Sequence, residues 1–229
     1  MQGYLKLTQF LGCPQEVDWP LHLETTSEDE AAADHIWDRL NLPHAEKVVV
    51  FHNGSGRGGR ASAKAWPVEY AARLAHKIAT DSDFSVLLLC GPEERAIAAE
   101  TAVLAKHVRV KSLADQPLSL GLSKACVRRS RLMVSSDSGP RHFAAAFGIP
   151  LLTLFGPTHQ AWGNTEHKLT IELQQNVPCG PCMQKTCPLG HHQCMKELTV
   201  DHVYSAFTQL IKRTSILKQN QKMRVEIPA

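Results

Sequence analysis

Residues 132–158 read LMVSSDSGPRHFAAAFGIPLLTLFGPT, and this stretch decides the fold. It holds an apolar run of strand length at 132–134, a polar loop at 135–142, a short helix at 140–147 and a second apolar run at 151–155. Apolar runs this short are typical of strands that are buried on both faces of a parallel sheet. A helix between two such strands is the crossover that joins parallel neighbours. The stretch therefore predicts a β-α-β unit.

The same alternation extends from this unit toward both ends of the chain. Ser27, with Glu30 three residues later, forms a capping box that predicts the start of a helix. Further strands are predicted at 47–51, 85–89, 108–110 and 168–173, and further helices at 27–40, 67–80, 93–106, 118–129 and 200–217. Strands and helices in regular alternation predict the α/β class, as a doubly wound, Rossmann-like parallel sheet.

Four loops of unusual composition follow the predicted strands. They begin at His52, Cys90, Ser135 and Gly156. Ligands of doubly wound sheets bind outside the carboxyl ends of the strands, where such loops meet. The sequence therefore predicts one composite site along that edge.

The first of these loops, 52–64, reads HNGSGRGGRASAK and is rich in glycine, with cations at Arg57, Arg60 and Lys64. Glycine lets backbone N–H groups approach an anion closely, and cations stabilise phosphate charge. The loop contains G-x-G-x-x-G, but the next helix begins only at Pro67 and no acidic residue ends the next strand, so a dinucleotide site is not supported. The Walker A pattern fails too. A phosphate-binding loop and a mobile surface loop remain the two interpretations.

The loop 135–142, SSDSGPRH, carries a more specific signal. It joins a strand to a helix, so its backbone N–H groups and hydroxyls can converge on a pyrophosphate at the helix N-terminus. Asp137 is predicted to cap that helix or to hydrogen-bond sugar hydroxyls, and His142 to donate to an anion. The alternative is purely structural, an N-cap beside a partly buried histidine.

Two further loops offer polar groups to the same edge. Thr158 follows a Gly-Pro turn and can present its hydroxyl, although most such turns have no other role. Glu93 and Glu94 follow the strand at 85–89, where a carboxylate suits ribose hydroxyls or caps a helix.

A cluster of four of the seven cysteines lies in the C-terminal part of the chain. Cys179, Cys182, Cys187 and Cys194 follow the pattern C-x2-C-x4-C-x6-C. Four thiolates suit tetrahedral zinc, so a structural zinc site is predicted, with reduced cysteines or disulfides as the alternatives. Basic and aromatic residues do not interleave around the cluster, which argues against nucleic-acid binding.

Composition limits the classes of protein to which the chain can belong. Hydrophobic residues make up 43% and charged residues 21% of the 229, which is ordinary for a globular protein. The net charge of +3 is too small to indicate nucleic acid or a membrane surface as partner. No apolar run reaches the roughly 18 residues of a membrane span, and the N-terminus lacks the pattern of a signal peptide. The expected location is the cytoplasm, with at most peripheral contact with a membrane.

Several motifs, in the right order, resemble glycosyltransferase family 9, the family of the ADP-heptose:lipopolysaccharide heptosyltransferases. SSDSGPRHFAAA at 135–146 and LFGPT at 154–158 resemble its central signature, and KAWP at 64–67 resembles its Lys-x-Trp-Pro. The run at 179–195 resembles a cysteine-rich loop of many members, the second heptosyltransferase in particular. The resemblance runs from about Val48 to the closing helix.

The resemblance implies a GT-B enzyme whose C-terminal, Rossmann-like domain, equivalent to this chain, binds an ADP-sugar donor. It implies an inverting transfer of a heptose or a related sugar to the lipopolysaccharide inner core, with no cofactor for catalysis. Lys64 and His142 would stabilise the leaving nucleoside diphosphate. The donor-binding residues that it implies are Gly54, Ser55, Lys64, Glu93 or Glu94, Asp137, Ser138, Gly139 and His142, to which the strand-end argument adds Thr158.

The same resemblance divides the chain into parts. Residues 1–46 are expected to form an interdomain segment and a helix, 47–198 the nucleotide-sugar-binding domain with the cysteine loop at 178–195, and 199–229 a closing helix and tail. The acceptor-binding domain, with its general base, is expected to be missing, so the chain resembles half of an enzyme. Its glycine-rich loop is longer than is usual in the family, with two extra arginines.

Three other functions stay open at this point. The chain is then a non-catalytic nucleotide-sugar-binding module, another GT-B-like enzyme such as a nucleotide-sugar epimerase, or a metal-stabilised interaction domain whose Gly/Arg loop binds a partner.

Overall fold

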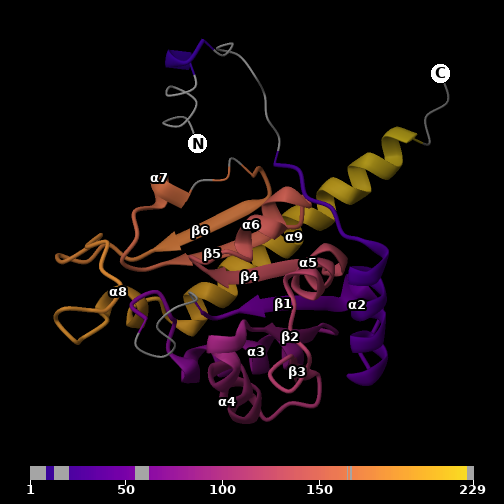
Figure 1. Cartoon of the computed structure of the whole chain (residues 1–229), viewed down its shortest axis with the longest axis horizontal. Coiled ribbons are helices and arrows are strands. Elements are labelled where there is room, and N and C mark those ends of the chain that lie inside the picture. The colour runs from indigo at the N-terminus through magenta and orange to yellow at the C-terminus, as the bar shows by residue number, and fades with distance from the viewer. Residues whose placement is uncertain (1–8, 13–20, 55–61, 164, 166, 226–229) are drawn as a thin grey trace.

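The computed structural model describes residues 9–12, 21–54, 62–163, 165 and 167–225, with 217–225 as backbone alone. Within these residues lies one sheet of six parallel strands in the order β3-β2-β1-β4-β5-β6 (Figure 1). The strands are β1 (Val48–His52), β2 (Ser85–Leu89), β3 (Val110–Ser112), β4 (Leu132–Ser136), β5 (Leu151–Phe155) and β6 (Thr170–Gln174). The strand order reverses between β1 and β4, which makes this pair the topological switch point. The predicted doubly wound parallel sheet is confirmed.

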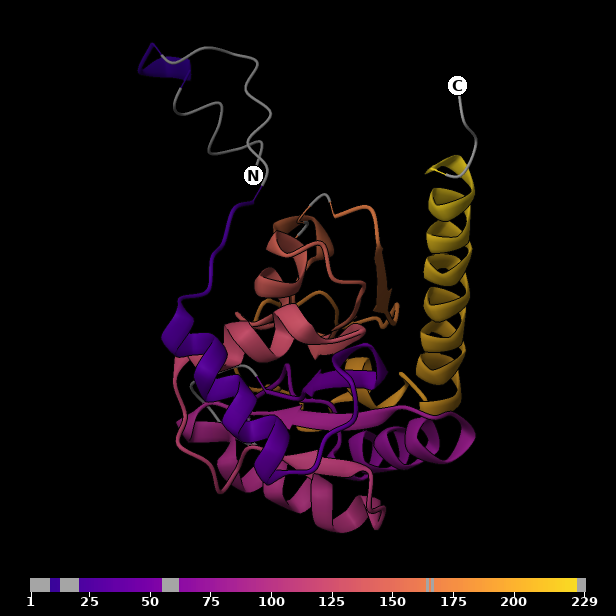
Figure 2. The same cartoon turned by 90° about the vertical axis from the view of Figure 1, so that its right-hand side faces the viewer.

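Helices cover both faces of the sheet in two layers (Figure 1 and Figure 2). In one layer, α2 (Ser27–Arg39) packs against α5 (Leu120–Arg129), which packs against α6 (Arg141–Ala146). In the other, α3 (Val68–Asp81) packs against α4 (Arg95–Ala105) and α9 (Val200–Val225). The remaining short elements are α7 (Gln160–Gly163), α8 (Gln193–Lys196) and the 3-10 turns Ala45–Lys47 and Pro92–Glu94. No helix in the described part of the chain is both long enough and apolar enough to cross a membrane.

Most of the predicted elements are present, with shifts at their ends. β2 and β5 have the predicted bounds, whereas β3 begins at Val110 instead of 108. The predicted cap of α2 is wrong. Thr26, rather than Ser27, accepts the N–H of Asp29 at 3.1 Å, and Asp29 accepts the N–H of Thr26 at 3.1 Å in return. Both Thr26 and Ser27 offer a capping hydroxyl, and the point at which the backbone becomes helical decides between them.

Three further differences concern helix ends and short helices. The helix predicted at 93–106 begins as a 3-10 turn before α4, a common form for the first turn of a helix. The last helix runs past 217 to Val225. α7 and α8 are not predicted from the sequence, because four residues are too few to show a helical period.

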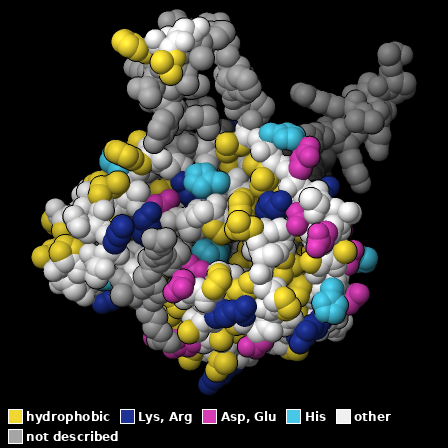
Figure 3. Space-filling view, viewed as in Figure 1, with side chains coloured by type: hydrophobic (Ala, Val, Ile, Leu, Met, Phe, Trp, Pro, Cys, Tyr) yellow, Lys and Arg dark blue, Asp and Glu magenta, His cyan; other side chains and the backbone are white. Residues whose placement is uncertain are grey.

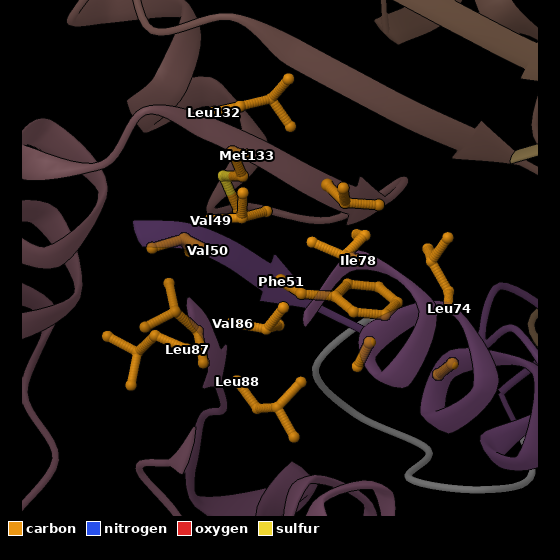
Figure 4. Close-up of a cluster of buried hydrophobic side chains, with 14 of the residues drawn as sticks. Val49, Val50, Phe51, Leu74, Ile78, Val86, Leu87, Leu88, Leu132 and Met133 are labelled. Atoms are coloured by element: carbon orange, nitrogen blue, oxygen red, sulfur yellow. The ribbon is translucent and has the colours of Figure 1, made fainter. Parts of the chain in front are cut away.

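The core lies between the central strands and the helices that cover them (Figure 4). Phe51 of β1 points toward Leu74 and Ile78 of α3, while Val50, the preceding residue, points to the other face of the sheet. All four side chains are at most 1% exposed. Burial of side chains of this size contributes about 1.5–3 kcal/mol each. The ends of β1, β2 and β4 are therefore held in place by a dense core.

α9 packs onto the same core. Phe207 and Leu210 are buried, and the ring of Phe207 meets that of Phe84 edge-to-face at 6.2 Å between centres. Trp66, at the exit of the glycine-rich loop, is also buried and donates its indole N–H to the carbonyl of Leu198 at 2.9 Å. The segment that leads into α9 is thus tied to the loop that leads into α3.

Candidate functional site

The switch point brings the ends of β1 and β4 together. The hydroxyl of Ser136, the last residue of β4, accepts the N–H of Gly54 at 3.2 Å and donates to the carbonyl of the same residue. These two bonds tie the start of the glycine-rich loop to β4. A side chain at Gly54 would overlap Glu94, since its Cβ would lie 2.6 Å from the Glu94 Cγ, so a larger residue here would have to displace the Glu94 side chain.

Lys64 and Asp137, 73 residues apart in the sequence, form an ion pair at this edge. The Lys64 Nζ lies 2.7 Å from the Asp137 Oδ2, and the lysine side chain is 33% exposed whereas the aspartate is 10% exposed. Burial raises the pKa of Asp137, but the bond and charge of Lys64, with Thr158 and Arg141, outweigh it and hold the pKa below its usual value. The carboxylate is therefore ionised at neutral pH.

The predicted helix cap at Asp137 is wrong. The N-cap of α6 is Pro140, and no side chain makes a capping bond there. The carboxylate of Asp137 is committed elsewhere, because Arg141 and Lys64 hold one oxygen each. Two full positive charges therefore take up the carboxylate, and Lys64 and Arg141 both help to hold its pKa below the usual value.

Arg141 is the second cation beside Asp137, and it is buried. Its Nε lies 3.1 Å from the Asp137 Oδ1, an Nη2 proton goes to the carbonyl of Gly163 at 2.6 Å, and the guanidinium lies 5.3 Å from the ring centre of Phe155. A Cβ at Gly163 would overlap this guanidinium. The Arg141 Nη1 has no hydrogen-bond partner among the described residues. Arg141 is not among the residues predicted from the sequence, although a cation four residues after Asp137 is the available signal.

Ser138 lies in a chain of hydrogen bonds that leads into the protein. Its Oγ is 3.1 Å from the Oγ of Ser135 and 3.0 Å from the Nδ1 of His52, the last residue of β1. His52 is 3% exposed. Burial lowers the pKa of His52, and the negative charge of Glu94 opposes this only in part, so the ring is neutral at neutral pH. His52 is a second residue to which the sequence analysis gives no role beyond starting a loop.

The other predicted donor residues occupy different surroundings. Glu94 is buried and its carboxylate accepts the N–H of Gly91 at 2.8 Å, so it caps its own turn, while Glu93 is exposed. Thr158 is buried, and a Cβ at Gly139 would meet no atom within 4 Å. Ser55, with Arg57 and Arg60, lies outside the described residues.

His142 is exposed and makes no side-chain hydrogen bond within the described part of the chain, although the neighbouring protein desolvates part of its ring. Desolvation by the neighbouring protein lowers the pKa of His142, and the positive charge of Arg141 lowers it further. The imidazole is therefore neutral at neutral pH and free to face a ligand.

The cysteine-rich loop borders the same edge. The Lys185 carbonyl accepts the N–H of Ala63 at 2.8 Å, and the Pro157 carbonyl accepts the N–H of Met183 at 2.8 Å. The loop therefore touches both the glycine-rich loop and the turn after β5. One cavity of about 30 Å³ has cysteine and histidine side chains in its lining, namely those of Cys179, Cys182, Cys187, Cys194, His191 and His192.

These cysteines are free thiols in the structure. The backbone N–H of His192, with those of the three residues before it, holds the pKa of the Cys187 thiol below its usual value. The Sγ of Cys179 lies 3.9 Å from the Nε2 of His191. Across the described ranges, however, no three Cys, His, Asp or Glu side chains are grouped so that they could hold a metal ion. The structural zinc stays a prediction.

A hollow of about 640 Å³ lies at the opposite edge of the sheet. Its lining includes Ala45, Arg131 and Pro150, which come just before β1, β4 and β5. Ligands of parallel sheets bind at the carboxyl ends, so this hollow is not assigned to the site. Figure 3 shows acidic and basic side chains interspersed over the face that it draws, with no broad area of one sign.

The sequence matches a known protein family. A model described as Glycosyltransferase family 9 (heptosyltransferase) matches residues 3–193. Lipooligosaccharide heptosyltransferase 2 of Campylobacter jejuni is 30% identical over 183 residues, which cover 77% of this chain and 55% of that protein. Lipopolysaccharide heptosyltransferase 1 of Pseudomonas aeruginosa is 32% identical over 181 residues, which cover 76% of this chain and 45% of that protein. The chain spans about half the length of these relatives.

Solved structures show the same fold. A glycosyl transferase family 9 structure from Veillonella parvula matches with a TM-score of 0.76 at 20% identity, over 93% of this chain and 59% of that one. The ADP-heptose lps heptosyltransferase II of E. coli matches with a TM-score of 0.70 at 20% identity, over 90% of this chain and 57% of that one.

Proposed function

The chain belongs to glycosyltransferase family 9, and from this premise we propose that it forms the donor-binding half of a heptosyltransferase. Its whole enzyme would transfer a heptose from an ADP-sugar to the lipopolysaccharide inner core. The observation that carries the proposal is the juxtaposition of Lys64 with the Ser138–Gly139 turn at the switch point. There the Lys64 ammonium pairs with Asp137, and the next two residues along the chain offer a hydroxyl at Ser138 and open backbone at Gly139. The names of the curated relatives supply the sugar and the acceptor class.

The chemistry needs a group that stabilises the departing diphosphate. Lys64 is partly exposed, so its ammonium can turn from Asp137 to a phosphate oxygen, where a fixed cation lowers the barrier as negative charge develops. Asp137 keeps Arg141 as counter-ion when that happens. His142, exposed at the start of α6, is assigned to the same leaving group or to the sugar. The base that deprotonates the acceptor is assigned to a domain outside this chain.

The first test is a titration of the purified chain with ADP, with UDP and GDP as competitors, by calorimetry. ADP is expected to bind saturably, and Lys64→Ala to weaken it by about tenfold or more, because a bond to a charged group is worth about 1.5–3 kcal/mol. Lys77→Ala is the matched control, since it removes the same charge from another partly exposed Lys–Asp pair, on α3. An ADP affinity that is the same in Lys64→Ala as in the wild type would remove Lys64 from the site.

Product assays separate the remaining functions. The complete enzyme should release ADP only when an acceptor is present, whereas a binding module releases none and an epimerase converts the sugar without an acceptor. A folded chain that binds no nucleotide at all favours the interaction domain.

A structural zinc in the cysteine-rich loop is a separate part of the proposal. Four thiolates have the right chemistry for zinc, although their present arrangement does not hold an ion. The measurement is elemental analysis of the purified chain. About one zinc per chain, lost in a Cys187→Ser variant, supports the site; a folded chain without metal contradicts it.

A further inference from the structure

His52 is a buried histidine at the centre of the switch point that the proposed chemistry leaves unused. It is the last residue of β1, and it is the register partner of Ser135 on β4. Its Nδ1 lies 3.0 Å from the Oγ of Ser138, which lies 3.1 Å from the Oγ of Ser135. Ser135 in turn donates to the carbonyl of Ser136 at 2.7 Å. Three polar side chains therefore form one line from the ligand edge into the sheet.

The direction of every bond in this line follows from counting protons. A hydroxyl has one proton to donate, and a carbonyl has none. Ser135 gives its proton to the Ser136 carbonyl, so in its contact with Ser138 it can only accept. Ser138 then gives its single proton to Ser135, so in its contact with the imidazole it can only accept. The proton between Ser138 and His52 must therefore belong to Nδ1 of the ring.

The ring carries this proton as a neutral imidazole. Burial lowers the pKa of His52, and Glu94 is the acidic group whose charge acts against that effect. With Nδ1 protonated, Nε2 is bare. The tautomer is thus set by the serine line and not by solvent, from which the ring is shielded.

We propose that His52 is a positioning residue for the donor, which holds the Ser138 hydroxyl through its Nδ1–H so that the Ser138 proton can turn from Ser135 to a diphosphate oxygen. This inference rests on the proposed function, because the diphosphate belongs to the ADP-sugar. When the proton changes direction, Ser138 exchanges a neutral acceptor, the Ser135 hydroxyl, for a charged one, the diphosphate oxygen, and it keeps the bond that it accepts from His52. Ser135 keeps its own bond to Ser136, so no buried donor is left without a partner.

The fold makes His52 suited to this role. β1 is buried along its whole length, and its pairing with β4 fixes the distance between His52 and Ser135. A donor on a central strand is more rigid than one on a loop, and a hydroxyl that accepts one bond becomes a better donor in the next. The bond from His52 therefore orients the Ser138 hydroxyl and makes it a stronger donor.

The first arm of the test reads the tautomer by itself. Two-bond ¹H–¹⁵N correlation spectra of the labelled chain at pH 7.5 report which ring nitrogen carries the proton, and loss of the signal in His52→Asn assigns it among the 12 histidines. The expected result is a protonated Nδ1 and a bare Nε2, with the pattern changed in Ser138→Ala. A proton on Nε2, or on both nitrogens, overturns the proposal whether or not the chain binds nucleotide.

The second arm measures ADP affinity by calorimetry. His52→Ala and Ser138→Ala are each expected to weaken the binding of ADP by about tenfold. The double variant is expected to lose no more than either single variant, because both changes remove the same bond between His52 and Ser138. His52→Asn, whose amide N–H reaches the place of Nδ1–H, is expected to keep the affinity within about threefold. It also serves if His52→Ala fails to fold.

Additive losses, or no rescue by Asn, would overturn the positioning role. If the wild-type chain binds no ADP, the proposed function fails in its donor step. The tautomer measured in the first arm then still decides whether the line of bonds is as described.

Discussion

Asp137 is held between two cations that differ in freedom. Lys64 is one-third exposed, whereas Arg141 is buried and is also fixed by the Gly163 carbonyl and the Phe155 ring. A ligand anion can therefore draw away the first cation but not the second. Such an arrangement leaves no buried carboxylate without a counter-ion, which would cost several kcal/mol. In the proposed donor site, Arg141 would therefore keep Asp137 in place while Lys64 turns to the ligand.

His52 makes the stability of the chain depend on pH. Its folded-state pKa lies below its usual value, so as the pH falls below about 6.5 the unfolded chain takes up a proton that the folded chain resists. The free energy of unfolding is expected to decrease from pH 7.5 to 5.5, and the decrease to be smaller in His52→Asn. Urea denaturation at both values measures it. His202→Asn, on the exposed side of α9, is the control, and equal slopes in the wild type and His52→Asn would contradict the prediction.

At the scale of the element, α2 and α5 are joined by charge and by close approach. Gly121, in the first turn of α5, lies so close to Asp29 that a Cβ there would overlap the carboxylate. Asp29 also completes the capping box of α2 and accepts Lys124 at 3.0 Å. The ion pairs between the two helices are Lys124–Asp29, Arg128–Glu30, Arg129–Glu30 and Arg129–Asp34. Exposed pairs contribute little singly, so the close approach is the more specific contact.

Gly121→Ala is expected to destabilise the chain, against the usual trend. Alanine in place of a helical glycine normally adds about 0.5–1 kcal/mol, but here the new methyl group must displace Asp29, so a loss of about 1–2 kcal/mol is expected. The measurement is the free energy of unfolding in urea. In an Asp29→Ala background, where the obstacle is gone, the same change should be neutral or stabilising. A stabilising effect in the wild-type background would show that α2 and α5 are free to move apart.

At the scale of the whole molecule, α9 and the sheet behave as one unit. Phe207 lies in the core beside Phe84 and Tyr204, on the face that α3 also covers. α9 is therefore held on the sheet by side-chain packing and not only by its connection along the chain. Leu198 and Val200, on either side of the predicted boundary, belong to the same core, and the boundary itself stays a prediction.

Phe207→Ala is expected to cost about 3–5 kcal/mol, because a buried aromatic ring leaves a cavity. Thermal unfolding followed by circular dichroism should show one transition at a lower temperature. Ile216→Ala, an exposed position of the same helix, should stay within about 0.5 kcal/mol of the wild type. A separate early transition of α9, with the sheet unaffected, would instead mark residues 199–229 as an independent part.

Much of the fold follows from the sequence because burial leaves a periodic trace. The short apolar runs at 85–89 and 151–155 have the bounds of strands β2 and β5, and the alternation with helices predicts the doubly wound sheet. The family resemblance, based on motifs between 64 and 195, is confirmed by the match to residues 3–193. Local signals were less reliable at helix ends, where Thr26 and Ser27 compete for one cap.

The sequence alone determined the class of sheet, its family and the edge at which polar loops gather. It also placed the loops that hold Lys64 and Asp137 at the same edge, since the carboxyl ends of parallel strands share one edge of the sheet. Only the tertiary structure decided the partners of these residues. Asp137 pairs with Arg141 and Lys64 instead of capping α6, and Glu94 turns inward to its own turn. Ser138 is hydrogen-bonded to His52, which lies 86 residues away in the sequence. The reason is physical. Periodicity reports which side of an element is buried, whereas a hydrogen bond depends on distances of about 3 Å that packing alone sets.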